Sequence, residues 1–91
     1  MESNEISLHQ VKVFQAVRSS SQWITSKEVA NLSGVADRTA RSHLLKLVKL
    51  GLIDQAEVFP AHRYRVSDFA GKRNLAYLQR IEKAAEVFGL A

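Results

Sequence analysis

Apolar residues recur at helical spacing in the N-terminal part of the chain. Val11, Phe14 and Val17 fall on one face of a helix. Ser7 precedes this run, and Gln10 lies three residues after Ser7, which is the spacing of a capping box. In a capping box each of the two side chains bonds a backbone group that the first turn leaves unpaired. The pattern predicts a helix over residues 8–19.

A second helix is predicted to begin after Thr25. Thr25 and Glu28 repeat the capping-box spacing, and Gly34 can take the left-handed conformation that ends a helix. The apolar pair Trp23-Ile24 just before it predicts a short edge strand. Only residues 33–36 separate this helix from the next pattern, and so short a turn sets two helices at a steep angle.

The third helix is predicted over residues 37–50 and has two different faces. Successive residues are placed 100° apart, which puts one set in the core: Ala40, Leu44, Leu47 and Val48. The opposite face is polar and basic: Arg38, Thr39, Ser42, Lys46 and Lys49, with Arg41 on its flank. Gly51 ends the helix, with Leu52 placed to contact Leu47.

The basic face of this third helix has no acidic residue after Asp37. It therefore lacks the i to i+4 ion pairs that usually cover an exposed helix, and we interpret phosphate as the missing partner. A solvated basic face is the alternative interpretation. Leu45 and Leu50 lie off the core face and are expected to pack on a neighbouring element.

Residues 52–59 and 63–67 predict two strands joined around Pro60-Ala61-His62. In the second strand Tyr64 and Val66 alternate with Arg63 and Arg65, so the two pairs lie on opposite faces. Such a hairpin would carry His62 and Arg63 near its tip. The alternative is a surface hairpin whose arginines only keep its edge soluble.

The last helix is predicted within residues 68–91, with Ser67 or Asn74 as its cap because Gly71 interrupts the pattern. Its apolar positions are spaced by three and four: Leu75, Leu78, Ile81, Ala85 and Phe88. This stripe either completes the core or pairs with its own copy in a two-helix seam. We favour dimerisation, because the earlier helices already supply a core.

Composition and charge narrow the function classes. Ninety-one residues make one domain, no apolar run approaches a membrane span of about 18 residues, and there are no cysteines. The three histidines lack ligand-like spacing, so we expect a cytoplasmic protein without membrane, metal or cofactor. The net charge of +4 comes entirely from residues 35–73, where eight basic residues face four acidic ones. This distribution suits a phosphate-facing surface.

The order helix, short strand, helix, tight turn, helix and hairpin is that of the winged helix-turn-helix domain. The segment SGVADRTARSHLLKLVKLGLI closely resembles its turn and recognition helix: Ser33-Gly34-Val35 matches the turn, Arg38-Thr39 opens the recognition helix, and Leu44, Leu47 and Gly51-Leu52-Ile53 match core positions. The resemblance covers residues 8–67, and ArsR- and MarR-type bacterial regulators are the nearest comparison. In those proteins the C-terminal helix commonly helps to form a dimer.

Two departures from that pattern affect what the resemblance implies. Ala36 stands where such proteins often have a serine or threonine N-cap, which weakens the helix terminus by about 1 kcal/mol unless Asp37 substitutes. The cysteines that metal-sensing members use are missing, so metal sensing is not carried over.

The expected fold class is therefore mainly α with a small β-hairpin (α+β), as a winged helix-turn-helix. Residues 1–7 are a short tail, 8–67 the winged domain and 68–91 a C-terminal dimerisation helix. Its expected function is sequence-specific binding of double-stranded DNA by a dimeric transcriptional regulator, such as a repressor, at a roughly palindromic site. The alternative is a winged-helix protein-interaction or assembly module that docks on an acidic protein surface.

The expected DNA contacts follow from this assignment. In the recognition helix, Arg38 and Arg41 would contact guanine edges, Thr39 and Ser42 bases or phosphates, and Lys46 and Lys49 the backbone. Flanking phosphate or minor-groove contacts would come from the wing (His62, Arg63 and Arg65) and phosphate contacts from the start of the second helix (Thr25, Ser26 and Lys27). An enzyme is not expected, because no carboxylate pair, activated nucleophile or glycine-rich phosphate loop stands at an interpretable spacing.

Overall fold

Four helices and a three-stranded sheet make up the computed structural model, which describes residues 6–58 and 60–90. In chain order they are α1 (Leu8–Ser19), β1 (Ile24–Thr25), α2 (Ser26–Ser33), α3 (Asp37–Lys49), β2 (Ile53–Ala56), β3 (Arg63–Val66) and α4 (Ala70–Val87). The predicted fold class is confirmed. Most of the predicted N-terminal tail (residues 1–5), Phe59 of the predicted first wing strand, and Ala91 lie outside the described residues.

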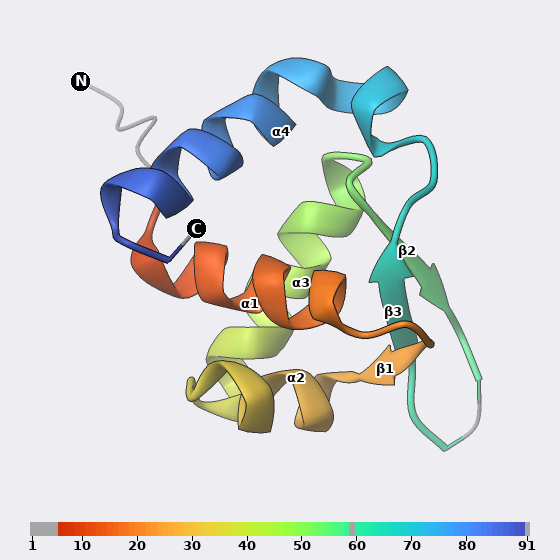
Figure 1. Ribbon diagram of the computed structural model, residues 1–91. Coiled ribbons are helices and arrows are strands. Elements are labelled where there is room, and N and C mark those ends of the chain that lie inside the picture. The colour runs from red at the N-terminus through yellow and green to blue at the C-terminus, as the bar shows by residue number, and fades with distance from the viewer. Residues whose placement is uncertain (1–5, 59, 91) are drawn as a thin grey trace.

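The elements are arranged around α1 (Figure 1). Helices α2 and α3 pack on one side of α1, α4 crosses its other side, and the hairpin of β2 and β3 projects away from α4. Ala40, Leu44 and Leu47 of α3 are fully buried in the same core cluster as Phe14 and Val17 of α1. Because that face of α3 is held inside, the opposite face is held outside.

The start of α1 differs from the predicted capping box. Ser7 Oγ accepts the Gln10 backbone N–H at 3.1 Å, as predicted. The Gln10 side chain, however, is buried and does not return a bond to the backbone of Ser7. Its Oε1 accepts a hydrogen bond from the hydroxyl of Tyr77 in α4 at 2.9 Å, so Gln10 links α1 to α4 instead.

The capping box at the start of α2 is complete, as predicted. Thr25 Oγ1 accepts the Glu28 N–H at 3.2 Å, and Glu28 Oε1 accepts the Thr25 N–H at 2.9 Å. These bonds from Thr25, backbone first and hydroxyl second, lower the pKa of the Glu28 carboxyl. At the other end of α2, Gly34 takes a φ of 74° and its N–H bonds the Ala30 carbonyl.

The turn from α3 into the wing is a Schellman motif, as predicted. Gly51 has a φ of 85°, its N–H bonds the Val48 carbonyl at 3.0 Å, and the Leu52 N–H bonds the Leu47 carbonyl at 3.1 Å. A Cβ at Gly51 would lie 3.0 Å from the Arg73 Cβ. Glycine is therefore required here both by the backbone and by the close approach of α4.

The sheet is antiparallel with strand order β1-β3-β2. Ile24 of β1 pairs with Tyr64, and Ile53 of β2 pairs with Val66. β2 ends at Ala56, earlier than the predicted residue 59. The short edge strand was correctly predicted, although it is shifted by one residue to Ile24–Thr25.

Helix α4 is interrupted at Asn74, whose φ of −158° and ψ of 67° are not helical. The Asn74 side chain accepts the Tyr77 N–H at 3.3 Å and donates to the Leu50 carbonyl at 3.1 Å. Ser67 in turn accepts the Phe69 N–H at 3.0 Å. Of the two residues predicted as possible caps, Asn74 caps the second helical segment, whereas Ser67 bonds the turn before α4, whose N-cap is Phe69.

Substitution of Gly34 and of Gly51, two of the glycines at positive φ, tests the packing at the α3–wing turn. Gly34→Ala should cost about 1 to 2 kcal/mol in the free energy of unfolding, because of the left-handed backbone alone. Gly51→Ala should cost about 1 kcal/mol more, because the new methyl group also meets Arg73, whereas nothing lies within 4 Å at Gly34. Urea unfolding measures both values, and equal losses would contradict this account of Gly51.

Removal of the N-cap of α2 should be visible in the titration of Glu28. Thr25→Ala should raise the pKa of the Glu28 carboxyl toward its ordinary value of 4.5. The lowered pKa in the folded state means that these bonds stabilise the fold above the unfolded pKa and that the stabilisation is lost as pH falls through the folded pKa. Carboxyl carbon NMR as a function of pH gives the measurement. The backbone N–H of residue 25 remains after this substitution, so only the part of the shift that comes from the hydroxyl should be lost. A Glu28 pKa unchanged by Thr25→Ala would show that the Thr25 hydroxyl does not lower it.

Candidate nucleic-acid interface

The outward face of α3 is a polar stripe that contains one apolar residue, Leu45. Its exposed side chains after Asp37 are Arg38, Arg41, Ser42, Leu45, Lys46 and Lys49, and Thr39 is half-buried beside them. The stripe exists because Ala40, Leu44 and Leu47 point into the core at the complementary helical positions. We call these six exposed residues the α3 stripe.

The cations of the α3 stripe have few partners within the protein. Arg41 pairs with Asp37 one turn earlier at 3.7 Å, which corrects the expectation that this face has no internal ion pair. Both side chains are largely exposed, and such pairs contribute little to stability, so a phosphate or base can replace Asp37 at small cost. Over residues 6–58 and 60–90, the side chains of Arg38, Lys46 and Lys49 form no hydrogen bond or ion pair.

A groove of about 400 Å³ lies between the α3 stripe and the wing. It is lined by Ser26, Arg41, Leu45, Gln55, Pro60, Ala61, His62 and Tyr64. The predicted tip residue His62 and the predicted recognition residue Arg41 are therefore brought to the same groove. Leu45 was predicted to pack on a neighbouring element, but it lines this groove with 48% of its surface exposed.

Tyr64 contributes a buried ring to the groove from β3. Burial raises the pKa of the Tyr64 hydroxyl, and the positive charge of Arg41, which lines the same groove, acts in the opposite direction. Across the hairpin, the Gln55 amide nitrogen and His62 Nδ1 are hydrogen-bonded. The wing side of the groove is therefore formed by the buried Tyr64 ring and the hydrogen-bonded pair of Gln55 and His62.

Arg65 of the wing does not join this groove. Alternation along β3 places Arg65 on the sheet face opposite Tyr64. There its guanidinium lies 4.7 Å from the centre of the Trp23 ring and 3.8 Å from Asp54. The structure thus brings His62 to the α3 stripe but turns Arg65 away, and Arg65 has partners of its own.

The predicted phosphate site at the start of α2 is changed by its capping box. The backbone N–H groups of Thr25 and Glu28 are already bonded, and the Thr25 hydroxyl lies 3.1 Å from the Glu28 carboxylate. That negative charge occupies the helix N-terminus where a phosphate would bind, so Thr25 does not offer a free phosphate site. Ser26 lines the α3–wing groove, and Lys27 is exposed.

The predicted dimerisation stripe on α4 is divided by the structure. Ile81 and Ala85 are buried in the core of the single chain, so they are not available to a partner. Leu75 is 53% exposed and Phe88 is 41% exposed, while Leu78 is half-buried. The reason is that α4 uses one edge of its apolar face to cover α1.

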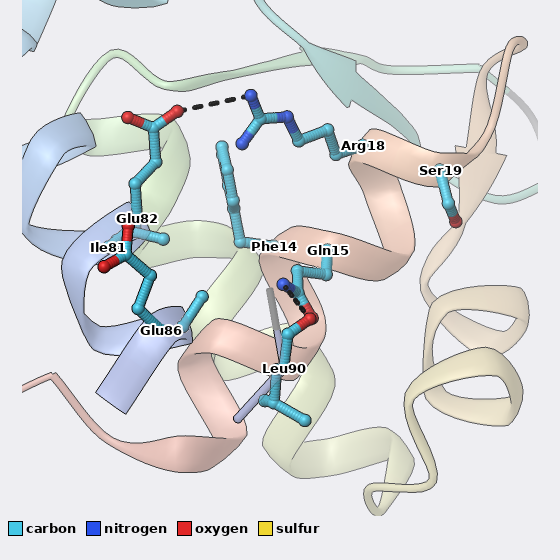
Figure 2. Close-up of a pocket in the computed structure, with 9 residues that line it drawn as sticks. Phe14, Gln15, Arg18, Ser19, Ile81, Glu82, Glu86 and Leu90 are labelled. Carbon is cyan, nitrogen blue, oxygen red and sulfur yellow. Dashed lines mark hydrogen bonds and ion pairs between the residues drawn. The ribbon is translucent and has the colours of Figure 1, made fainter. Parts of the chain in front are cut away.

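A second groove of about 510 Å³ marks this contact between α1 and α4 (Figure 2). Phe14 of α1 and Ile81 of α4 line it together. An ion pair from Arg18 to Glu82 at 3.3 Å crosses it, and Gln15 Nε2 donates to the Leu90 carbonyl at 3.2 Å. These bonds hold the C-terminal end of the chain on α1.

Other kinds of site are not evident in the part of the chain that the structure describes. In residues 6–58 and 60–90 there is no group of three or more histidine, aspartate or glutamate side chains that could hold a metal ion. Within the same residues, no helix is long and apolar enough to cross a membrane.

No protein-family model matches the chain, and no curated protein matches its sequence. Solved structures do match it. The ST1889 protein from the archaeon Sulfolobus tokodaii is 25% identical with a TM-score of 0.67, covering 92% of this chain and 84% of that one. A MarR family transcription regulator, SP03579, is 19% identical with a TM-score of 0.63, covering 93% of this chain and 54% of that one. Sso10a-2, a DNA-binding protein from Sulfolobus solfataricus, is 13% identical with a TM-score of 0.61, covering 92% and 87%.

The same fold also forms a small part of an enzyme. Human N-acetylserotonin methyltransferase matches at 16% identity and a TM-score of 0.60, over 70% of this chain but only 18% of the methyltransferase. The chain spans about half the length of the MarR family regulator and most of the two archaeal proteins. The chain has the winged helix-turn-helix fold, and its structural neighbours include MarR-family and other winged-helix transcription regulators.

Proposed function

We propose that this protein binds double-stranded DNA sequence-specifically and acts as a small dimeric transcriptional regulator. The observation that carries the proposal is the α3 stripe, which presents four cations on one exposed helix face beside the wing groove. A helix with its side chains is about 10 to 12 Å wide, which suits the major groove of about 12 Å. Phosphates on both rims would then neutralise the excess positive charge.

Within this proposal the polar residues of the α3 stripe, and Thr39 beside them, have separate roles. Arg38 and Arg41, in the first turns of α3, contact guanine edges, because a guanidinium can bond two acceptors of guanine at once. Thr39 and Ser42 contact bases or phosphates. Lys46 and Lys49, farther along the helix, contact the backbone and contribute affinity without sequence preference.

The wing contributes a smaller contact in this proposal. His62 and Arg63 lie at the start of β3 near the hairpin loop, where they reach a flanking phosphate or the minor groove. Arg63 shares the sheet face of Arg65 but lies nearer the hairpin loop, whereas Arg65 is left out because its guanidinium is already engaged by Trp23 and Asp54. Thr25 is left out as well, because its hydroxyl and N–H serve the α2 cap.

Dimerisation is proposed through the exposed apolar residues of α4. Leu75 and Phe88 stay uncovered in the single chain although both are large and apolar. Two copies related by a twofold axis would place two α3 helices in successive turns of one DNA face, about 34 Å apart. The preferred site would then be roughly palindromic.

Fluorescence anisotropy with random duplex DNA at low salt tests the core of the proposal. Binding that weakens steeply as salt rises is expected, since each phosphate contact releases counterions. Selection of bound sequences from a random library then gives the preferred site and its symmetry. Absence of binding at low salt would refute the DNA proposal and would favour the alternative of a protein-interaction module that docks on an acidic surface.

Two substitutions in the α3 stripe distinguish base-specific contacts from contacts to the DNA backbone. Arg38→Ala should cost about 1 to 3 kcal/mol on the selected site and relax the preference at one base position. Lys49→Ala should weaken binding to all sequences alike and lower the salt slope by about 1. Lys83→Ala on α4, an exposed lysine away from the stripe, is the matched control and should change neither. Equal small losses from Arg38→Ala and Lys49→Ala would contradict the separate roles.

Introduction of charged residues on α4 tests the proposed dimer surface. Leu75→Asp combined with Phe88→Asp should shift the protein from dimer to monomer in sedimentation velocity, because each carboxylate would lose water in an apolar seam. Leu32→Asp on α2, where the leucine is 63% exposed, is the control and should leave the dimer intact. A wild-type protein that sediments as a monomer at all concentrations would rule out the seam without touching the DNA proposal.

A further inference from the structure

We infer that Leu45 is a specificity-determining residue that contacts the 5-methyl group of a thymine in the bound site. The inference rests on the proposed DNA binding and adds to it the base chemistry that the arginines do not supply. It starts from the single interruption of the α3 stripe, because the other exposed residues of that stripe are polar or charged.

The position of Leu45 is central in the stripe. Arg41 precedes it by four residues and Lys49 follows it by four, so the three side chains lie one above the other on the same helix face. Leu45 is 48% exposed and lines the α3–wing groove together with Arg41 and His62. Any ligand that contacts Arg41 and the wing therefore covers Leu45 as well.

A half-exposed leucine alone is ordinary on a protein surface. Here it lies among cations that suit phosphates, so the surface that covers it is the edge of the DNA bases. In the major groove the bases present hydrogen-bonding groups and one apolar group, the thymine 5-methyl. The leucine side chain forms no hydrogen bonds, so against a polar base edge it would displace water without replacing the hydrogen bonds that the water made. Contact with thymine is thus favoured over the other three bases.

The helix geometry also gives the distance between the two bases that are read. Four residues from Arg41 to Leu45 correspond to about 6 Å along the helix axis. Neighbouring bases on one strand are about 3.4 Å apart. The thymine is therefore expected one or two base pairs from the guanine that Arg41 contacts, on the side toward the C-terminal end of α3.

Replacement of thymine by uracil tests the contact without changing the protein. Uracil lacks only the 5-methyl group and keeps every hydrogen-bonding group of the pair. In the site selected from the random library, each thymine is replaced in turn, and anisotropy measures the affinity of the unaltered protein. One position in each half-site should lose about fourfold in affinity, the factor for one buried methyl-sized group.

The protein variants then assign that loss to its residue. Leu45→Ala should bind the thymine and uracil sites equally at that position, although more weakly than the wild type binds thymine. Leu32→Ala removes another exposed leucine, on α2 and outside the groove, and should keep the fourfold discrimination. Thermal unfolding followed by circular dichroism confirms that both variants are folded.

Two results would overturn the inference while leaving DNA binding in place. One is a set of uracil sites that all bind as tightly as the thymine site. The other is a Leu45→Ala variant that keeps the wild-type discrimination. If the protein bound no DNA at all, the proposed function would fail first, and the inference about Leu45 would fail with it.

Discussion

The turn at Gly51 and Leu52 is the constraint on which the candidate interface depends. It closes α3 with the bonds from Gly51 to Val48 and from Leu52 to Leu47, and it sends the chain directly into β2. Leu52 is fully buried and its carbonyl accepts the Ser67 N–H, so both ends of the wing are attached at one point. Because both residues of the turn are hydrogen-bonded to α3, the bonds that end the helix also fix the position of the wing relative to α3, and with it the groove between them.

Much of this fold is predictable from the sequence because its signals are local. Thr25 with Glu28, Gly34, and Gly51 with Leu52 each specify a helix end within a few residues, and each was found where it was predicted. Gln10 shows the limit of such signals. Its spacing from Ser7 is that of a capping box, but Tyr77, far away in the sequence, offers a hydroxyl inside the core and takes the side chain. Local patterns do not contain that competition.

The sequence indicates which residues belong to the candidate site better than it indicates where their side chains point. The basic positions of α3 followed from the helical period, and the structure leaves them exposed. Arg65 followed from alternation too, but its partners come from other parts of the chain, Trp23 from just before β1 and Asp54 from β2. Leu45 lies off the core face and was predicted to pack on a neighbouring element, but in the structure it is exposed and lines the groove. The stripe on α4 was divided for the same reason, since periodicity alone does not say which apolar positions a neighbouring helix covers.

The pairing of Ile24 with Tyr64 has a consequence for how the molecule assembles. It joins residues about 40 positions apart, so a long loop must close before any bond between β1 and β3 is gained. In contrast, α2 and α3 meet across a short turn, and β2 and β3 form a local hairpin. The helix pair is thus expected to form early and the strand β1 to dock late. Until it does, β3 offers an open edge to other chains. Docking of two residues of strand, Ile24 and Thr25, therefore covers the β3 edge as well as completing the sheet.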